Sequence, residues 1–170
     1  MTRQQYERIS APFCAPARRR ALNIINTALT GFVYVAFILL CLYLLLTRDM
    51  RLIPVLLITG IPFVALSFIR KKINAPRPYE ALDIQPLIQK DTKGKSFPSR
   101  HVFSAFVIAV ATGAIFLPLG VATAITAALL MVIRVIGGVH FPKDVIAGAL
   151  SGILCGAAGI LICRMLGGAL

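Results

Sequence analysis

Residues 101–133 read HVFSAFVIAVATGAIFLPLGVATAITAALLMVI, a stretch of 33 residues without Asp, Glu, Lys or Arg. At 1.5 Å per residue, a single helix of this length would extend about 50 Å, well beyond the roughly 30 Å hydrocarbon core of a bilayer. Pro118 and Gly120 lie near the middle of the stretch. We therefore expect a hairpin of two membrane helices, 101–116 and 120–138.

Three further stretches, 21–47, 52–69 and 145–163, also lack charged residues, and with 101–133 they cover 97 of the 170 positions. A membrane helix needs about 20 mostly apolar residues, so these stretches predict spans at 23–46, 52–69 and 145–165. The expected fold is an all-α, multi-span transmembrane helix bundle of about five spans, built by a single integral-membrane domain over 1–170. The last span has glycine at every fourth position, which predicts a smooth face for close helix packing: Gly148, Gly152 and Gly156.

The composition supports a membrane protein, because 58% of the residues are hydrophobic and only 14% are charged. Soluble domains carry about 25% charged residues. A net charge of +12 would by itself fit nucleic acid, but the charge-free stretches exclude a soluble nucleic-acid-binding module. Residues 1–20 contain five arginines and form a candidate interfacial helix at the amino terminus.

The polar residues gather in two connections that we expect on the same side of the membrane. If each span crosses the membrane once, the connection 70–100 and the connection 134–144 both lie on this side. The first connection contains eight basic residues: Arg70, Lys71, Lys72, Arg77, Lys90, Lys93, Lys95 and Arg100. Both histidines of the chain, His101 and His140, lie at span boundaries on this side.

His140 is followed four residues later by Asp144, with Pro142 between them. Pro142 favours a helix start, which places Asp144 in or just before the first helical turn. From there its carboxylate can reach one imidazole nitrogen and turn the other outward as a base or nucleophile. The alternative interpretation is that Asp144 serves only as a helix cap, next to a histidine at the membrane interface.

His101 follows Pro98, Ser99 and Arg100 at the expected start of a span. Free backbone N–H groups at a helix N-terminus bind anions, and a histidine beside them can donate a proton to a leaving oxygen. Ser99 is also expected to act as a simple N-cap, and the two roles are compatible.

Arg134 lies inside an apolar span, where a charged side chain is costly unless it faces a polar cavity or a partner. It is therefore a candidate functional residue. Arg70 and Arg77 follow the second span and fit phosphate oxygens, although basic residues at a span end also serve as topology signals. The sequence shows no Cys/His or paired-carboxylate metal set and no Walker-type glycine loop, so we expect neither a metal nor a cofactor.

Three ordered strings resemble the motifs of the type 2 phosphatidic acid phosphatase family, whose patterns read K-x6-R-P, P-S-G-H and S-R-x5-H-x3-D. They are Arg70-x6-Arg77-Pro78, Pro98-Ser99-Arg100-His101 and Arg134-x5-His140-x3-Asp144. The match covers about residues 70–148 and follows the order of the family.

The resemblance implies a membrane lipid phosphatase that works without metal, through a phosphohistidine intermediate. His140 would attack phosphorus, Asp144 would orient it, and His101 would protonate the leaving oxygen. The phosphoryl oxygens would be held by Arg70, Arg77, Arg134 and Ser99, and Arg100 would add a contact or hinder close approach of the backbone.

The sequence departs from the family patterns at three positions. Arg70 replaces the motif lysine, Arg100 replaces the glycine of the second motif, and Ile133 replaces the serine before Arg134. Both histidines and the aspartate are retained, so we expect an active enzyme. The candidate substrates are phosphatidate, phosphatidylglycerol phosphate and polyprenyl phosphates or diphosphates. A lipid phosphotransferase with the same site, and a non-catalytic protein that binds or transports anionic lipids, are the alternatives.

The side of the membrane that holds the site is ambiguous. Outside the candidate site residues, the site side has eleven Lys or Arg and the opposite side has three. This bias predicts a cytoplasm-facing site, whereas the family resemblance favours a site that faces outward. We expect a multi-pass protein of the cell membrane, in particular a bacterial plasma membrane.

Overall fold

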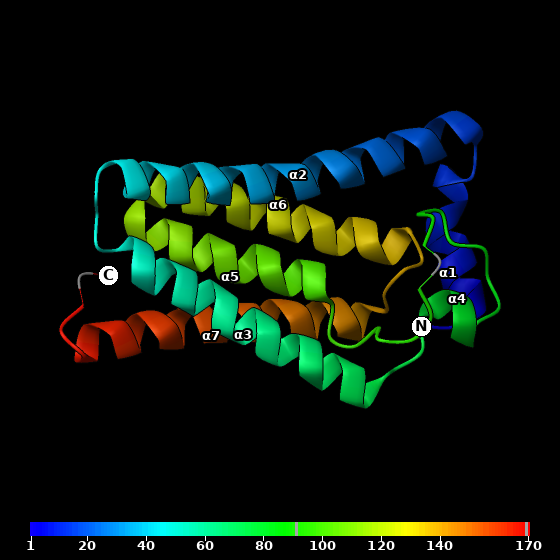
Figure 1. Ribbon diagram of the computed structural model, residues 1–170. Coiled ribbons are helices and arrows are strands. Elements are labelled where there is room, and N and C mark those ends of the chain that lie inside the picture. The colour runs from blue at the N-terminus through cyan, green and yellow to red at the C-terminus, as the bar shows by residue number, and fades with distance from the viewer. Residues whose placement is uncertain (91, 169) are drawn as a thin grey trace.

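The computed structural model describes residues 1–90, 92–168 and 170, and these form helices joined by short connections. Five long helices lie along one axis, and shorter helices gather at one end (Figure 1). The elements in chain order are α1 (Arg3–Ser10), a 3-10 turn η1 (Ala11–Phe13), α2 (Pro16–Leu46), α3 (Leu52–Ile73), α4 (Pro78–Ala81), α5 (Arg100–Ile115), α6 (Leu117–Ile136) and α7 (Pro142–Met165). The expected all-α bundle is thereby confirmed. Four of the described helices are long and apolar enough to cross a membrane, and α5 is a shorter apolar helix, which is roughly consistent with the expected number of about five spans.

The first span begins earlier than its apolar sequence indicates. Helix α2 begins at Pro16, a residue that favours the first helical turn, and it includes the arginines at 18–20. The amino-terminal helix expected over 1–20 is therefore limited to α1, which Thr2 caps by accepting a hydrogen bond from the Gln5 amide. The basic residues at 18–20 extend the membrane helix beyond its apolar part.

The hairpin forms as expected, but it turns at Phe116 rather than at Gly120. Phe116 alone separates α5 from α6 and has an extended backbone, and Pro118 lies in the first turn of α6. Gly120 lies inside α6, where a Cβ atom would come within 2.6 Å of the Gly113 amide nitrogen. The glycine therefore allows the two helices to approach closely.

Helix α5 is the centre of the bundle, in contact with α2, α3, α6 and α7. It has 16 residues, fewer than a lipid-facing span needs, and most of its side chains are buried. The predicted smooth face of α7 packs against it: Cβ atoms at Gly148 and Gly152 would lie 2.7 Å from the carbonyl oxygens of Ser99 and Phe103. The outer helices expose large apolar side chains such as Phe68 and Leu129, as a bundle surrounded by lipid does.

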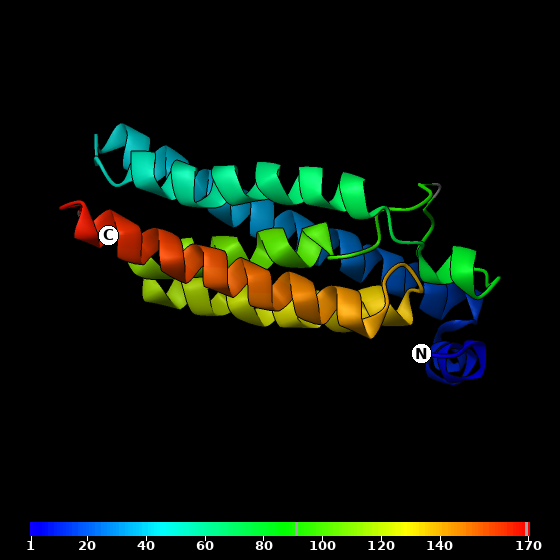
Figure 2. The same ribbon diagram turned by 90° about the horizontal axis from the view of Figure 1, so that it is seen from below.

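Both polar connections lie at the same end of the bundle, as expected. In the two views, α4, residues 82–90 and 92–99 and the connection from α6 to α7 share this end with the amino terminus (Figures 1 and 2). The described carboxy-terminal residues lie at the opposite end. An odd number of crossings explains this separation of the two ends of the chain.

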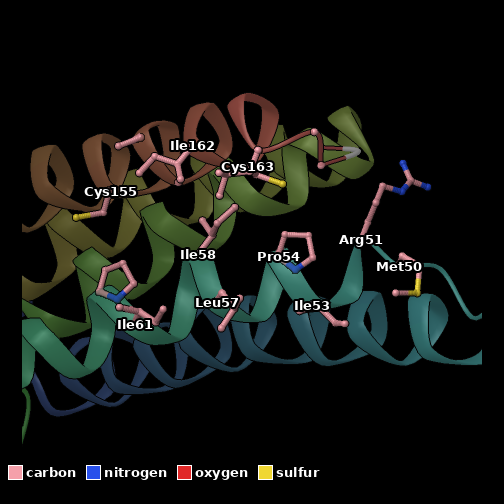
Figure 3. A pocket seen from close by; sticks show the side chains of 16 residues that line it. Met50, Arg51, Ile53, Pro54, Leu57, Ile58, Ile61, Cys155, Ile162 and Cys163 are labelled. Atoms are coloured by element: carbon pink, nitrogen blue, oxygen red, sulfur yellow. The ribbon is translucent and has the colours of Figure 1, made fainter.

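An apolar groove of about 740 Å³ lies between α3 and α7, near the loop 47–51 (Figure 3). Ile58, Ile61, Cys155 and Ile162 line it, and its one charged residue, Arg51, is paired with Asp49 at 2.6 Å. The groove is at the end away from the polar connections. It contains none of the histidines or the carboxylate singled out in the sequence, so the candidate site lies elsewhere.

Candidate active site

The polar end of the bundle contains a cavity of about 440 Å³ between α3, α5 and the loop 90–95. We call it the phosphate cavity. Arg70, Arg77, Arg100, His101 and His140 all line it, together with Lys71, Lys90, Lys93 and Lys95. Seven lining residues are Lys or Arg, and no carboxylate is among the described ones. This concentration of positive charge suits a multiply charged anion.

His140 and Asp144 are brought together, but Ser96 lies between them. The Ser96 hydroxyl donates to Asp144 Oδ2 at 2.5 Å, and Ser96 Oγ lies 3.4 Å from His140 Nδ1. The direct distance from Nδ1 to Oδ2 is 3.7 Å, which is long for a hydrogen bond. The three side chains are at most 1% exposed. The carboxylate therefore orients the imidazole mainly through the serine hydroxyl.

The same carboxylate also caps α7, since Asp144 Oδ2 accepts a hydrogen bond from the Phe141 amide at 3.0 Å. The two interpretations of Asp144 from the sequence are thus compatible: it caps the helix and it faces the histidine. Burial lowers the pKa of His140 to about 4, against the opposing effect of the nearby Asp144 carboxylate. The imidazole is therefore neutral at pH 7 and can act as a nucleophile.

The guanidinium groups of Arg70 and Arg77 point toward Lys95 and Gly94, which line the phosphate cavity. The Arg70 guanidinium donates to the Lys95 carbonyl, and Arg77 donates to the carbonyls of Gly94 at 3.0 Å and Val139 at 3.1 Å. Both arginines are buried. Lys71, the neighbour of Arg70, is exposed at the rim. The structure therefore favours Arg70 over Lys71 at the place of the motif lysine.

Glu80 holds this part of the site together. Its Oε2 accepts hydrogen bonds from the amides of Arg77 at 2.9 Å and Gly94 at 2.8 Å. One carboxylate thus fixes the backbone of the arginine and of the loop that the arginine contacts.

The start of α5 connects the second and third motifs. The Ser99 amide donates to the Asp144 carbonyl at 2.8 Å. The expected N-cap by Ser99 is wrong in its detail, because the side chain makes no capping hydrogen bond and its buried Oγ has no partner in the described part of the chain. Arg100 is exposed and lines the phosphate cavity, with its guanidinium carbon 5.5 Å from the centre of the Phe63 ring.

Arg134 is in the last part of α6, and its carbonyl accepts a hydrogen bond from the His140 amide at 3.3 Å. It lines a second cavity of about 430 Å³, which we call the α2 cavity, formed by α2, residues 88–90, His101 and Arg134. Arg134 is 4% exposed, and its Nη2 lies 3.5 Å from Thr30 Oγ1. His101 and Lys90 line both cavities. The predicted site residues thus surround two adjoining cavities rather than one.

Three residues of this site were not singled out as site residues in the sequence: Ser96, Glu80 and Lys90. Ser96 is two positions before the P-S-R-H string, and its role depends on contacts with α7. Lys90 is one of many basic residues, but burial, with added repulsion from the site arginines, lowers its pKa to about 8. Only the folded chain distinguishes it from the exposed lysines around it.

Comparison with known proteins identifies a family that covers this part of the chain. The family model described as the PAP2 superfamily matches residues 51–166, which contain all three strings. Among curated proteins, none matches this sequence significantly.

The solved structures that resemble the chain include two bacterial proteins. LpxE from Aquifex aeolicus has 28% sequence identity and a TM-score of 0.66, with 84% of this chain and 92% of that chain covered. A transmembrane PAP2-type phosphatidylglycerolphosphate phosphatase from Bacillus subtilis has 21% identity and a TM-score of 0.63, with 95% and 94% covered.

Proposed function

The chain belongs to the PAP2 superfamily and is a membrane-embedded lipid phosphatase, and on this premise we propose the residues and the mechanism by which it acts. His140 attacks the phosphorus of a lipid phosphomonoester or diphosphate and forms a phosphohistidine. The observation that supports this assignment is the buried series His140, Ser96 and Asp144 at the wall of a cavity rich in arginine and lysine.

The nucleophile is Nε2 of His140. Its Nδ1 faces Ser96 Oγ, so the neutral tautomer with a proton on Nδ1 donates to Ser96, which in turn donates to Asp144. Nε2 then has a free lone pair. When Nε2 bonds to phosphorus, the ring becomes positively charged, and the Asp144 carboxylate stabilises that charge through the serine.

The basic groups of the phosphate cavity bind the phosphoryl oxygens. Arg70, Arg77 and Lys90 offer donors from three sides of the cavity, and guanidiniums stabilise the charge that spreads over the oxygens in phosphoryl transfer. The unpaired Ser99 hydroxyl adds a donor at the start of α5.

His101 acts first as an acid and then as a base. As the bond between phosphorus and the leaving oxygen breaks, protonated His101 donates its proton to that oxygen and the alcohol departs. Neutral His101 then accepts a proton from water, whose oxygen attacks phosphorus and breaks the bond to His140 Nε2. Inorganic phosphate is released and both histidines return to their starting states.

Phosphate release from a panel of lipid phosphates, with and without EDTA, tests this function. We expect turnover that EDTA leaves unchanged and that His140→Ala abolishes. Retained turnover in His140→Ala would refute the phosphohistidine mechanism, and loss of activity with EDTA would indicate a metal enzyme. Transfer of the phosphate to a second lipid in place of its release as inorganic phosphate would identify a phosphotransferase.

We further propose that the chain lies in the plasma membrane of a bacterium, because two similar solved structures are bacterial proteins, and that the site faces outward, as the family resemblance favours. The amino terminus then also lies outside. Cysteine labelling of intact cells tests this orientation in a chain whose four native cysteines are replaced. Thr92→Cys, at the exposed loop of the site, should react with an impermeant reagent, and Met50→Cys at the opposite end should not. The reverse pattern would place the site in the cytoplasm.

A further inference from the structure

Three consecutive residues, Gly94, Lys95 and Ser96, connect the two halves of the site, and we call them the linking segment. Gly94 and Lys95 line the phosphate cavity. Ser96 is the residue between His140 and Asp144, with its hydroxyl 3.4 Å from Nδ1 of the histidine. The place of the Ser96 hydroxyl therefore depends on what holds this segment.

Each residue of the linking segment is hydrogen-bonded to residues 70–80, the part of the chain that contains the first motif. The three backbone bonds join the Lys95 carbonyl to Arg70, the Gly94 carbonyl to Arg77 Nε at 3.0 Å, and the Ser96 amide to the Ala75 carbonyl at 2.9 Å. The two motif arginines and the linking segment thus position each other.

Glu80 fixes both partners of one of these bonds. Its Oε2 accepts from the Arg77 amide at 2.9 Å and from the Gly94 amide at 2.8 Å, while Arg77 Nε donates to the Gly94 carbonyl. The carboxylate, the arginine and the glycine therefore form a closed ring of hydrogen bonds. Arg77 also donates from Nη1 to the carbonyl of Val139, the residue before His140, at 3.1 Å. The ring is thereby bonded to the chain that carries the nucleophile.

Glycine is required at the first position of the linking segment. Gly94 has a φ of +63°, a conformation that L side chains rarely adopt, and a Cβ atom there would collide with the Asn74 side chain. The missing side chain lets the segment lie close to the end of α3 and direct its amide to Glu80.

We propose that Glu80 is a positioning residue for the reaction: it holds the linking segment and Arg77 in one arrangement and so sets the Ser96 hydroxyl against His140. Glu80 is exposed and is not among the residues that line the phosphate cavity, so it acts through the residues that it holds. The inference rests on the proposed function, since Ser96 and Arg77 act in that reaction. What Glu80 supplies is an oxygen that accepts two hydrogen bonds, and its negative charge is not needed.

Kinetics of Glu80→Ala and Glu80→Gln test this role across pH. The substrate is phosphatidate, phosphatidylglycerol phosphate or a polyprenyl phosphate, whichever the wild-type chain hydrolyses fastest. Glu80→Ala should lower kcat about threefold to tenfold, the effect of about one lost hydrogen bond. The acid limb of kcat/KM should move to lower pH, because a weaker link through Ser96 leaves the imidazolium form of His140 less stabilised.

Glu80→Gln keeps an oxygen that can accept both bonds, so it should retain at least half of the wild-type kcat with an unshifted acid limb. Gly94→Ala, which disturbs the linking segment directly, should shift the acid limb as Glu80→Ala does. Equal losses in Glu80→Gln and Glu80→Ala would show that the charge is what counts, and wild-type kinetics of Glu80→Ala would show that nothing depends on the ring. Either result would overturn the proposal.

A double-mutant cycle with Ser96→Ala distinguishes positioning from a general loss of stability. Residues that act in one network have non-additive effects, so Glu80→Ala should lower kcat by a smaller factor in the Ser96→Ala chain than in the wild type. An equal factor in both would refute the coupling. Glu7→Ala is the matched control, because Glu7 is an exposed glutamate of α1 at the same end of the bundle, paired with Arg3. It should leave kcat and the acid limb unchanged, and a loss equal to that of Glu80→Ala would also count against the proposal.

Hydrogen exchange of the chain in detergent separates this proposal from the proposed function, because it needs no turnover. Peptides that cover 76–80 and 93–97 should exchange faster in Glu80→Ala than in the wild type and should stay protected in Glu80→Gln. If no lipid phosphate is hydrolysed but this pattern is present, the proposed function fails and the hold of Glu80 on the linking segment stands. If hydrolysis occurs and both the exchange and the kcat of Glu80→Ala match the wild type, the role of Glu80 fails and the proposed function stands.

Discussion

Replacement of Ser96 by alanine is the sharpest perturbation of the site, because it removes the link between His140 and Asp144 without altering either residue. The hydroxyl donates to a buried carboxylate at 2.5 Å, and hydrogen bonds to charged groups contribute about 1.5–3 kcal/mol. A loss of that size in the transition state corresponds to a decrease of about ten- to a hundredfold in kcat. Asp144 keeps its hydrogen bond from the Phe141 amide, so the fold should persist.

The variant should also shift the pH dependence. Without Ser96, Nδ1–H of His140 loses its acceptor and Asp144 no longer stabilises the imidazolium form through the hydroxyl, so the pKa of His140 falls. The acid limb of kcat/KM should therefore move to lower pH, an effect that a purely structural role of Ser96 would not produce.

The assay is phosphate release across pH, with thermal unfolding in detergent to confirm folding. Ser96→Thr, which keeps a hydroxyl, should restore much of the activity. Ser151→Ala removes a hydroxyl that bonds only to the preceding turn of α7 and should have no effect. Activity of Ser96→Ala within twofold of wild type, with an unshifted acid limb, would refute the assigned role of Ser96.

Two further predictions concern pH and packing. The wild-type kcat/KM should rise with pH through about 4, where His140 loses its proton and gains its nucleophilic lone pair, and fall at higher pH, where His101 loses the proton it donates and Lys90 loses its charge near pH 8. Lys90→Arg keeps the charge and should change the basic limb while the acid limb stays in place; an unchanged profile would show that Lys90 does not bind phosphate. Gly152→Ala should lower the unfolding free energy by about 1–3 kcal/mol in thermal or denaturant unfolding, because its Cβ would lie 2.7 Å from the Phe103 carbonyl oxygen. Gly60→Ala, whose Cβ would meet nothing within 4 Å, should cause no such loss, and equal effects would contradict the packing account.

The fold was predictable because its main determinants are long and periodic. Charge-free stretches define the helices, and the spacing of Gly148 and Gly152 indicates the face that packs on α5. Helix ends were less predictable. Pro16 starts α2 inside a basic segment, and a single residue, Phe116, forms the turn that the sequence placed near Gly120.

The candidate site was predictable where a motif fixes residue type and spacing together. His140 and Asp144 are only four residues apart, and Pro142 begins α7 between them, so their proximity is local in the chain. Ser96 approaches them only through the tertiary packing of the loop 94–99 against α7, for which no local pattern exists. The division between two cavities likewise depends on how α2 packs beside His101.

Detection of a phosphorylated intermediate tests the central claim most directly. The wild-type chain, mixed with a lipid phosphate labelled at its phosphorus and quenched in alkali, should retain label that is lost in acid and that peptide mapping assigns to His140. His140→Ala should retain none. Label on another residue, or full turnover without any protein-bound label under conditions that trap phosphohistidine, would contradict the account.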